Sequence, residues 1–107
     1  MITIILENGK NQIIEKIGSS DNRDYFLKPL NTETYPTLSE ISDSDNEIVI
    51  SEQMPQLIRE LENLKLSLNE AQRKQLDEVI RLSRICETNE DYFLIFTPFG
   101  SFWKEQS

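Results

Sequence analysis

The residues with the clearest potential for chemistry in this chain form one polar run, Asp43-Ser44-Asp45-Asn46-Glu47. Their D-x-D-x-E spacing matches the first ligands of a calcium-binding loop. Such a loop needs glycine at its sixth position for a sharp turn and a bidentate glutamate at its twelfth. Here those positions hold Ile48 and Met54. We therefore interpret the run as a solvated turn between two strands, and we predict that no metal binds there.

The rest of the sequence offers little catalytic chemistry. It has no histidine, so the commonest general base and a common zinc ligand are missing. Its single cysteine, Cys86, cannot hold zinc alone and is expected to be a small buried side chain on a helix. The three glycines are far apart, so there is no glycine-rich phosphate loop. Carboxylate chemistry is the only enzymatic option left, and we predict a protein without catalytic residues, metal or other cofactor.

Acidic and basic residues are distributed unevenly along the chain. The formal net charge is −8, and no lysine or arginine occurs from Pro29 to Ile58. The acidic residues of that interval are Glu33, Glu40, Asp43, Asp45, Glu47 and Glu52. Such a surface repels phosphate groups, which argues against nucleic acid and anionic membranes as partners and favours a basic protein. The alternative is that the acidic residues only increase solubility.

The partner-binding residues are expected at the acidic turn. Short polar side chains at a hairpin turn project into solvent, so Asp43, Asp45 and Glu47 are predicted to lie at the centre of the binding surface. Glu40, one strand back, is expected to share the surface. Tyr35 is a candidate aromatic anchor.

Two strands and a helix are expected to position this turn. Thr37–Ile41 and Glu47–Ile50 are predicted to be antiparallel strands, the second because it is β-branched and apolar. A helix over Glu52–Leu66 follows, with Ser51 as its N-cap and Pro55 in or at the end of its first turn. Apolar residues at helical spacing predict its buried face; they are Met54, Leu57, Ile58, Leu61, Leu64 and Leu68. The residues expected to face away are Arg59, Glu60, Glu62 and Asn63.

The N-terminal segment is predicted to be a β-hairpin. Ile2–Leu6 reads as a strand, and Asn8-Gly9 is a strong signal for a two-residue turn because both positions tolerate positive φ. Lys10–Ile17 would then be the return strand. Tyr25-Phe26-Leu27 is either a short third strand or a loop anchored in the core.

The C-terminal half is predicted to be a helix, a strand and an aromatic tail. The helix runs to about Glu87 or Thr88. Ser67, with Glu70 three positions later, fits a capping box at its start, and Asn69 is a second candidate cap. Its expected buried side is made of Leu76, Val79, Ile80, Leu82, Ser83 and Cys86. Tyr92–Phe96 is apolar on both sides of the pleat, which is typical of an interior strand.

Three large aromatic residues lie in the tail, which covers residues 98–107. They are Phe99, Phe102 and Trp103. Because exposed aromatic side chains form a costly apolar patch, we expect them to be at least partly buried. They would pack on the domain's own sheet or, alternatively, on a second copy of the chain.

These elements predict one α+β domain over residues 1–107. Its mainly antiparallel sheet would have about five strands, with a helical hairpin packed on one face. No run of about 18 apolar residues occurs, so no segment is expected to cross a membrane. The N-terminus has no basic leader, and a single cysteine agrees with a reducing compartment. We therefore expect a cytoplasmic protein.

Two motifs in the middle of the chain carry a resemblance to a known group. Tyr35-Pro36-x-Leu38-x-x-Ile41-x-Asp43 and Gln53-Met54-Pro55-x-Leu57-x-x-Glu60-Leu61 resemble motifs of small bacterial proteins of unassigned activity. In that group the two motifs flank an Asp-rich turn and a strand, and a second helix with a late cysteine and a closing aromatic strand follow. The resemblance covers roughly residues 30–97. The chain departs from the group at Asn46 and Ile48, where Gly and Thr are usual.

The group looks like the immunity proteins that neutralise bacterial toxins, so the resemblance implies a protein-binding function. Our first hypothesis is a non-catalytic binding module of this immunity type, which masks a basic protein such as a nuclease toxin with its acidic surface. The second is a structural or adaptor protein that forms a homodimer through its aromatic tail.

Overall fold

A computed structural model of the 107-residue chain describes residues 2–18 and 22–100. Its strands are β1 (Thr3–Glu7), β2 (Ile13–Ile17), β3 (Glu47–Ile50) and β4 (Phe93–Thr97). Its helices are α1 (Arg23–Phe26), α2 (Met54–Lys65) and α3 (Glu70–Glu87), with 3-10 turns η1 (Leu38–Glu40) and η2 (Ser51–Gln53).

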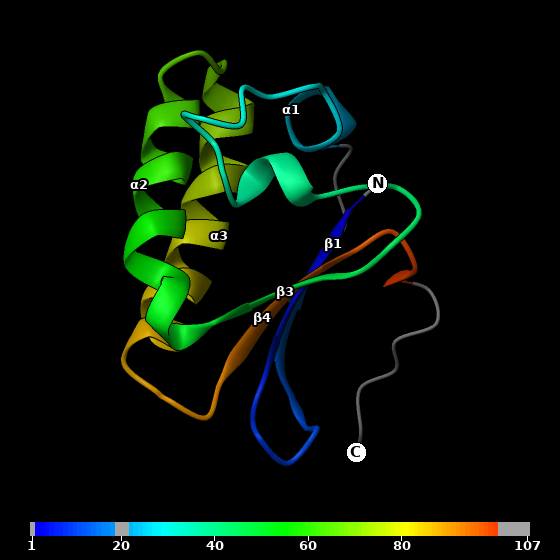
Figure 1. Cartoon of the computed structure of the whole chain (residues 1–107), viewed down its shortest axis with the longest axis vertical. Helices are drawn as coiled ribbons and strands as arrows, with labels where there is room; N and C mark the ends of the chain where they lie inside the picture. Colours follow the sequence, from blue (N-terminus) through cyan, green and yellow to red (C-terminus); the bar gives the residue numbers. More distant parts are fainter. Residues whose placement is uncertain (1, 19–21, 101–107) are drawn as a thin grey trace.

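The strands form one antiparallel sheet in the order β2-β1-β4-β3. Helices α2 and α3 lie together on one side of this sheet (Figure 1). The predicted α+β class with a helical hairpin on one face is therefore confirmed. The described part of the chain has four strands rather than about five. The predicted interior position of the last strand is also confirmed, because β4 lies between β1 and β3.

The strand predicted over Thr37–Ile41 is wrong, because this segment contains the 3-10 turn η1. The reason is the side chain of Glu60 on α2. One of its carboxylate oxygens accepts hydrogen bonds from the backbone N–H groups of Thr37 and Leu38, each at 2.9 Å. Glu60 was expected to face away from the core, but only 2% of its surface is exposed. A carboxylate therefore satisfies N–H groups that a neighbouring strand would otherwise bind.

Tyr25-Phe26-Leu27 is not a strand either, because Tyr25 and Phe26 end the short helix α1. The backbone oxygen of Asn22 accepts from both residues' N–H groups, and the Asn22 side chain bonds the backbone N–H and C=O of Ile2 at 2.7 and 2.6 Å. This exchange ties the start of α1 to the start of β1. Tyr25 and Phe26 are buried in the core as a result, which agrees with the alternative of a core-anchored segment.

The N-terminal hairpin is confirmed, but its turn is not the two-residue Asn-Gly turn. The loop is longer, because the N–H of Asn8 bonds the backbone oxygen of Gln12 at 3.0 Å and the return strand begins at Ile13. The residue with positive φ is Asn11, at 61°. The Asn8 side chain accepts from the N–H groups of Lys10 and Gln12, which stabilises the longer loop.

Both long helices are confirmed, but the predicted capping residues Ser51 and Ser67 are wrong; the Ser67 hydroxyl instead donates to the backbone oxygen of Leu64. Ser51 does not cap α2: the turn η2 comes first, and Gln53 Oε1 accepts from the N–H of Ile50 at 3.1 Å. Pro55 lies in the first turn of α2, as predicted. At α3, Asn69 is the cap, and its side chain and that of Gln72 bond each other's backbone N–H groups.

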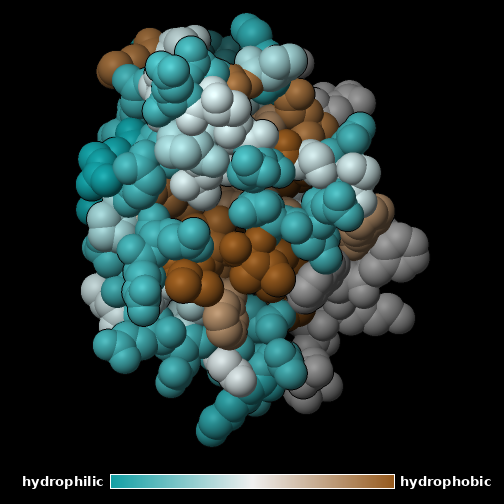
Figure 2. Space-filling view, in the orientation of Figure 1, coloured by the Kyte–Doolittle hydropathy of each residue, from teal (hydrophilic) through white to brown (hydrophobic). Residues whose placement is uncertain are grey.

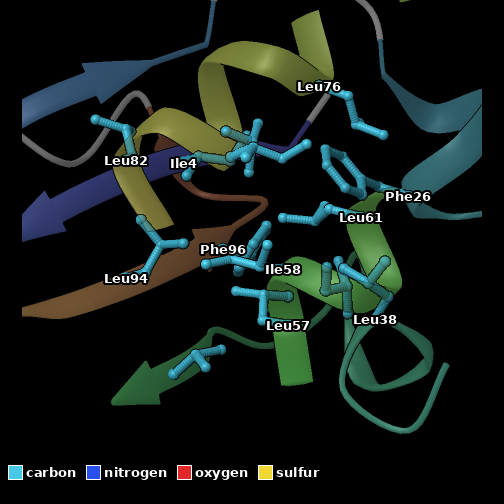
Figure 3. Packing of buried hydrophobic residues seen from close by; sticks show 14 of the residues in the cluster. Ile4, Phe26, Leu38, Leu57, Ile58, Leu61, Leu76, Leu82, Leu94 and Phe96 are labelled. Carbon is cyan, nitrogen blue, oxygen red and sulfur yellow. The ribbon is translucent and has the colours of Figure 1, made fainter. Parts of the chain in front are cut away.

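One hydrophobic core fills the space between the helices and the sheet (Figure 3). The predicted buried faces of both helices are confirmed, except that Leu68 is only partly buried. Alternate residues of β1 and β4, such as Ile4 and Phe96, contribute the sheet side of this core. Phe26 meets Phe96 edge to face, with ring centroids 5.7 Å apart. Ile85 of α3 is partly buried against the core.

The opposite face of the sheet also carries apolar side chains. Ile5 and Ile95 are buried there, opposite each other in the register of β1 and β4. Phe99, which follows β4, keeps 39% of its surface exposed. The other tail aromatics, Phe102 and Trp103, lie outside the described residues.

We expect Leu61→Ala to lower the free energy of unfolding by about 2–5 kcal/mol, because it would leave a cavity in the core. Leu61 is fully buried. Urea denaturation measures the loss. Leu66→Ala is the matched control, since Leu66 is 76% exposed and its truncation should change stability by no more than about 0.5 kcal/mol. Equal losses from the two variants would show that the assignment of the core is wrong.

Candidate partner-binding surface

The acidic turn lies in the loop that enters the edge strand β3. Asp43 and Asp45 are both exposed, and neither makes a hydrogen bond or ion pair with a residue that the structure describes. Ser42 organises this loop, because its Oγ accepts from the N–H groups of Ser44 and Asp45 at 3.3 and 3.1 Å. The loop is therefore held by a serine side chain, which leaves both carboxylates facing solvent.

Glu40 and Glu47 are brought close together at the two ends of this loop. Glu40 ends η1, and Glu47 begins β3. The pKa of Glu47 is raised above its ordinary value, first because the carboxyl group is partly removed from water and second because the charge of Glu40 lies nearby. A cation close to Glu47 would favour its ionised form and so offset the raised pKa.

Tyr35, the predicted aromatic anchor, is hydrogen-bonded to a residue of α2. Its hydroxyl oxygen accepts a hydrogen bond from Asn63 Nδ2 at 2.8 Å. Its partly buried ring packs against the core, beside Leu64 and Leu68. The side chain is thus already engaged within the fold, whereas those of Glu40, Asp43, Asp45 and Glu47 have no polar partner among the described residues.

Two isoleucines of β3, Ile48 and Ile50, form the apolar part of the surface. Ile48 is 55% exposed and Ile50 is 39% exposed, while Val49 between them is buried in the core. Among the four described strands, β3 pairs with β4 alone and so forms one edge of the sheet. Figure 2 shows an apolar area over β3 with hydrophilic side chains around it. The alternation of buried Val49 with two outward isoleucines follows from the period of a strand.

We call the group of Glu40, Asp43, Asp45, Glu47, Ile48 and Ile50 the β3 surface. Its carboxylates have no basic partner among residues 2–18 and 22–100, and its two isoleucines are exposed. Because an interface needs both a desolvated apolar centre and a specific charged rim, this arrangement is suited to binding another protein.

Other kinds of site find little support in the described residues. Those residues contain no group of three or more Cys, Asp or Glu side chains arranged to hold a metal ion. Cys86 is buried on α3, as predicted, and burial raises the pKa of its thiol to about 11. The S–H group donates to the backbone oxygen of Tyr92 at 3.4 Å. The thiol is therefore protonated at neutral pH and is not an activated nucleophile.

Of the helices that the structure describes, none combines the length and apolar character needed to cross a bilayer.

No protein-family model, curated protein or solved structure was found to match this chain.

We expect calcium to leave the thermal unfolding midpoint unchanged at constant ionic strength. The reason is that the loop after Asp43 lacks the glycine and the glutamate of a calcium site, at Ile48 and Met54. A ligand that binds only the folded state raises the midpoint as its concentration increases. A midpoint that climbs with calcium would therefore show that Asp43, Asp45 and Glu47 do hold a metal.

We expect Glu47→Gln to increase the free energy of unfolding at pH 7 and to have little effect at about pH 3. Folding raises the pKa of this carboxyl group, so the folded state binds the proton more tightly than the unfolded state. Ionisation of Glu47 therefore destabilises the fold at high pH, and this cost disappears as the pH falls below the ordinary pKa of 4.5. Urea denaturation at both pH values measures the difference. An equal gain at both would mean that the effect does not come from ionisation.

Proposed function

We propose that this chain is a non-catalytic protein-binding module that masks a basic region of another protein with its β3 surface. The observation that carries the proposal is the juxtaposition of unpaired carboxylates with the exposed isoleucines of an edge strand. Charge of one sign steers the encounter with an opposite patch. Ile48 and Ile50 then supply apolar area that loses water on contact.

The arrangement of charge elsewhere on the molecule supports a specific role for this surface. On the outer side of α2 and α3, several acidic side chains are paired with basic ones. Lys65 Nζ lies 2.5 Å from Asp77, and Arg81 bonds Glu78 on the same helix and Glu15 on β2. Solubility requires only a net charge. It does not require that the acidic side chains of one loop lie next to exposed apolar residues.

Inhibition of the immunity type fits this surface because it requires no chemistry from the inhibitor. A basic protein that acts on nucleic acid, such as a nuclease toxin, carries the positive surface that the unpaired carboxylates would attract. Covering that surface would block access of the phosphate backbone. The resemblance of the central motifs to small bacterial proteins that look like immunity proteins points in the same direction.

A second candidate is an adaptor protein that forms a homodimer through its aromatic tail. The observation in its favour is the exposure of Phe99, the first of the tail aromatics. Such a dimer would bury aromatic area without using the β3 surface. Substitutions in the β3 surface therefore distinguish the two functions: they should weaken binding of a basic partner but leave a homodimer formed through the tail unchanged.

We expect the double reversal Asp43→Lys, Asp45→Lys to slow association with a basic partner by about tenfold or more at low salt. The partner would be captured from the native host with the unchanged protein and then purified. The difference in on-rates should shrink at high salt, because ions screen exposed charges. Stability should remain nearly unchanged, since exposed charges contribute little to folding.

The matched control is Glu70→Lys, Glu78→Lys, which changes the net charge by the same amount on the helical side. It should slow association less than the reversal at the turn. Equal on-rates for the unchanged protein and the turn reversal at low salt would reject the proposal, and the adaptor function would then be favoured.

A further inference from the structure

A groove lies at the other end of β3, where the strand turns into α2 and where α3 leads into β4. Its volume is about 640 Å³. Its lining residues are Ile50, Ser51, Glu52, Pro55, Glu87, Glu90, Asp91 and Phe93. The two halves of the lining are far apart in the sequence and meet because α3 packs against η2. Ile50 belongs both to this groove and to the β3 surface.

The rim of the groove is acidic and carries no counter-charge. Glu52, Glu87, Glu90 and Asp91 are exposed, and none of them has a hydrogen bond or ion pair to a residue that the structure describes. No lysine or arginine is among the described residues that line the groove. Nor do these carboxylates form a group that could hold a metal ion within residues 2–18 and 22–100. Their arrangement suits a larger cation that reaches several of them at once.

Ser51 gives a second and independent sign that the groove receives a ligand. Only 8% of its surface is exposed, and its hydroxyl makes no hydrogen bond to any described residue. No fully enclosed side-chain oxygen or nitrogen in that part of the chain lacks a partner, so the Ser51 hydroxyl must still reach an opening. The groove that Ser51 lines provides that opening. A ligand that forms a hydrogen bond with this nearly buried hydroxyl would make the free energy of the complex more favourable.

The remaining lining residues are apolar. Phe93 is partly buried, and Ile50 and Pro55 are exposed. An aromatic face attracts a cation, and apolar side chains accommodate the methylene stem that carries it. The C-terminal end of α3, at Glu87, carries the negative pole of the helix and adds to the attraction.

We propose that this groove binds an arginine side chain of the basic partner. A guanidinium group has donors in one plane, so it can bond carboxylates and a hydroxyl while it stacks on an aromatic ring. A lysine ammonium satisfies fewer of these contacts because it is compact and does not stack in the same way. The proposal rests on the proposed function, in that the arginine belongs to the protein that covers the neighbouring β3 surface.

The test is a titration of the isotope-labelled full chain with the peptide acetyl-Gly-Ser-Arg-Ser-Gly-amide, followed by NMR. The amides of Ser51 and Phe93 should shift, with a Kd of about 1 mM. The same peptide with citrulline in place of arginine has the same shape without the charge, and it should bind at least about tenfold more weakly. Equal binding of the two peptides, or shifts confined to the loop around Asp43, would overturn the proposal.

Variants then assign the contacts. Glu87→Gln, Glu90→Gln should weaken the arginine peptide at least about threefold, and Ser51→Ala should weaken it about twofold or more. Asp43→Asn, Asp45→Asn is the matched control, since it removes the same charge outside the groove, and it should leave the peptide's Kd within about twofold. The amide spectrum of each variant reports whether the fold is intact. An unchanged Kd for the Glu87, Glu90 variant in a folded protein would contradict the proposed site.

A lysine peptide and spermidine distinguish arginine recognition from attraction of any cation. Both should bind the groove more weakly than the arginine peptide, and equal affinity would overturn the assignment of the ligand.

The results of these titrations can be told apart from the results that test the proposed function. If the groove fails to bind arginine while reversal of Asp43 and Asp45 still slows association, only the groove proposal falls. If the groove binds arginine but the reversal of Asp43 and Asp45 does not slow association, only the proposal that the β3 surface binds the partner is rejected.

Discussion

The buried carboxylate of Glu60 fixes the segment that leads into the acidic turn. One oxygen accepts from the N–H groups of Thr37 and Leu38, and the other accepts from Gln56 Nε2 at 3.0 Å. Leaving a buried N–H group without a partner costs about 1–3 kcal/mol. Glu60 thus attaches the loop before β3 to α2. Leu38, which begins η1, and Ile41, which follows it, bury their side chains in the core. The acidic turn starts from this fixed point, which places it at the edge of the sheet.

The fold separates two kinds of charged surface. The outer side of the helices is covered by ion pairs between neighbouring side chains, such as that of Lys65 with Asp77. The end of the sheet at β3 has carboxylates without partners among the described residues. The pKa of Glu47 is raised there, first because its carboxyl group is partly removed from water and second because the charge of Glu40 lies nearby, so ionisation of Glu47 costs stability. Functional surfaces commonly keep such unfavourable arrangements, because a ligand can relieve them.

Much of the fold could be predicted because the decisive signals are local. The apolar period changes at Ser51, and this change correctly marks the passage from β3 to α2. The cap of α3 was only partly predictable, because Ser67 with Glu70 also has the three-residue spacing of a capping box, whereas the structure uses Asn69 with Gln72. The conformation of Thr37–Ile41 could not be predicted, because it depends on Glu60, which is more than twenty positions away in the sequence. A charged residue next to an apolar stripe is normally solvated, so nothing local marked Glu60 as buried.

The same distinction applies to the candidate site. The acidic turn is contiguous in sequence and could be found, whereas the exposure of Ile48 and Ile50 depends on β3 being an edge strand, which only the strand order shows. The groove could not be predicted from the sequence, because Glu52 and Glu90, which both line it, come from distant parts of the chain.

The hydrogen bond between Gln53 and Ile50 has a consequence for how other chains can approach β3. An edge strand normally invites strand addition, because its outer N–H and C=O groups are free. Here the strand has four residues, and Gln53 Oε1 already occupies the N–H of Ile50 at one end. At the other end, Glu47 and the acidic turn would meet the same charges of a second copy. The edge is thereby protected against fibril-like stacking of identical chains, although its isoleucines stay accessible to a different protein.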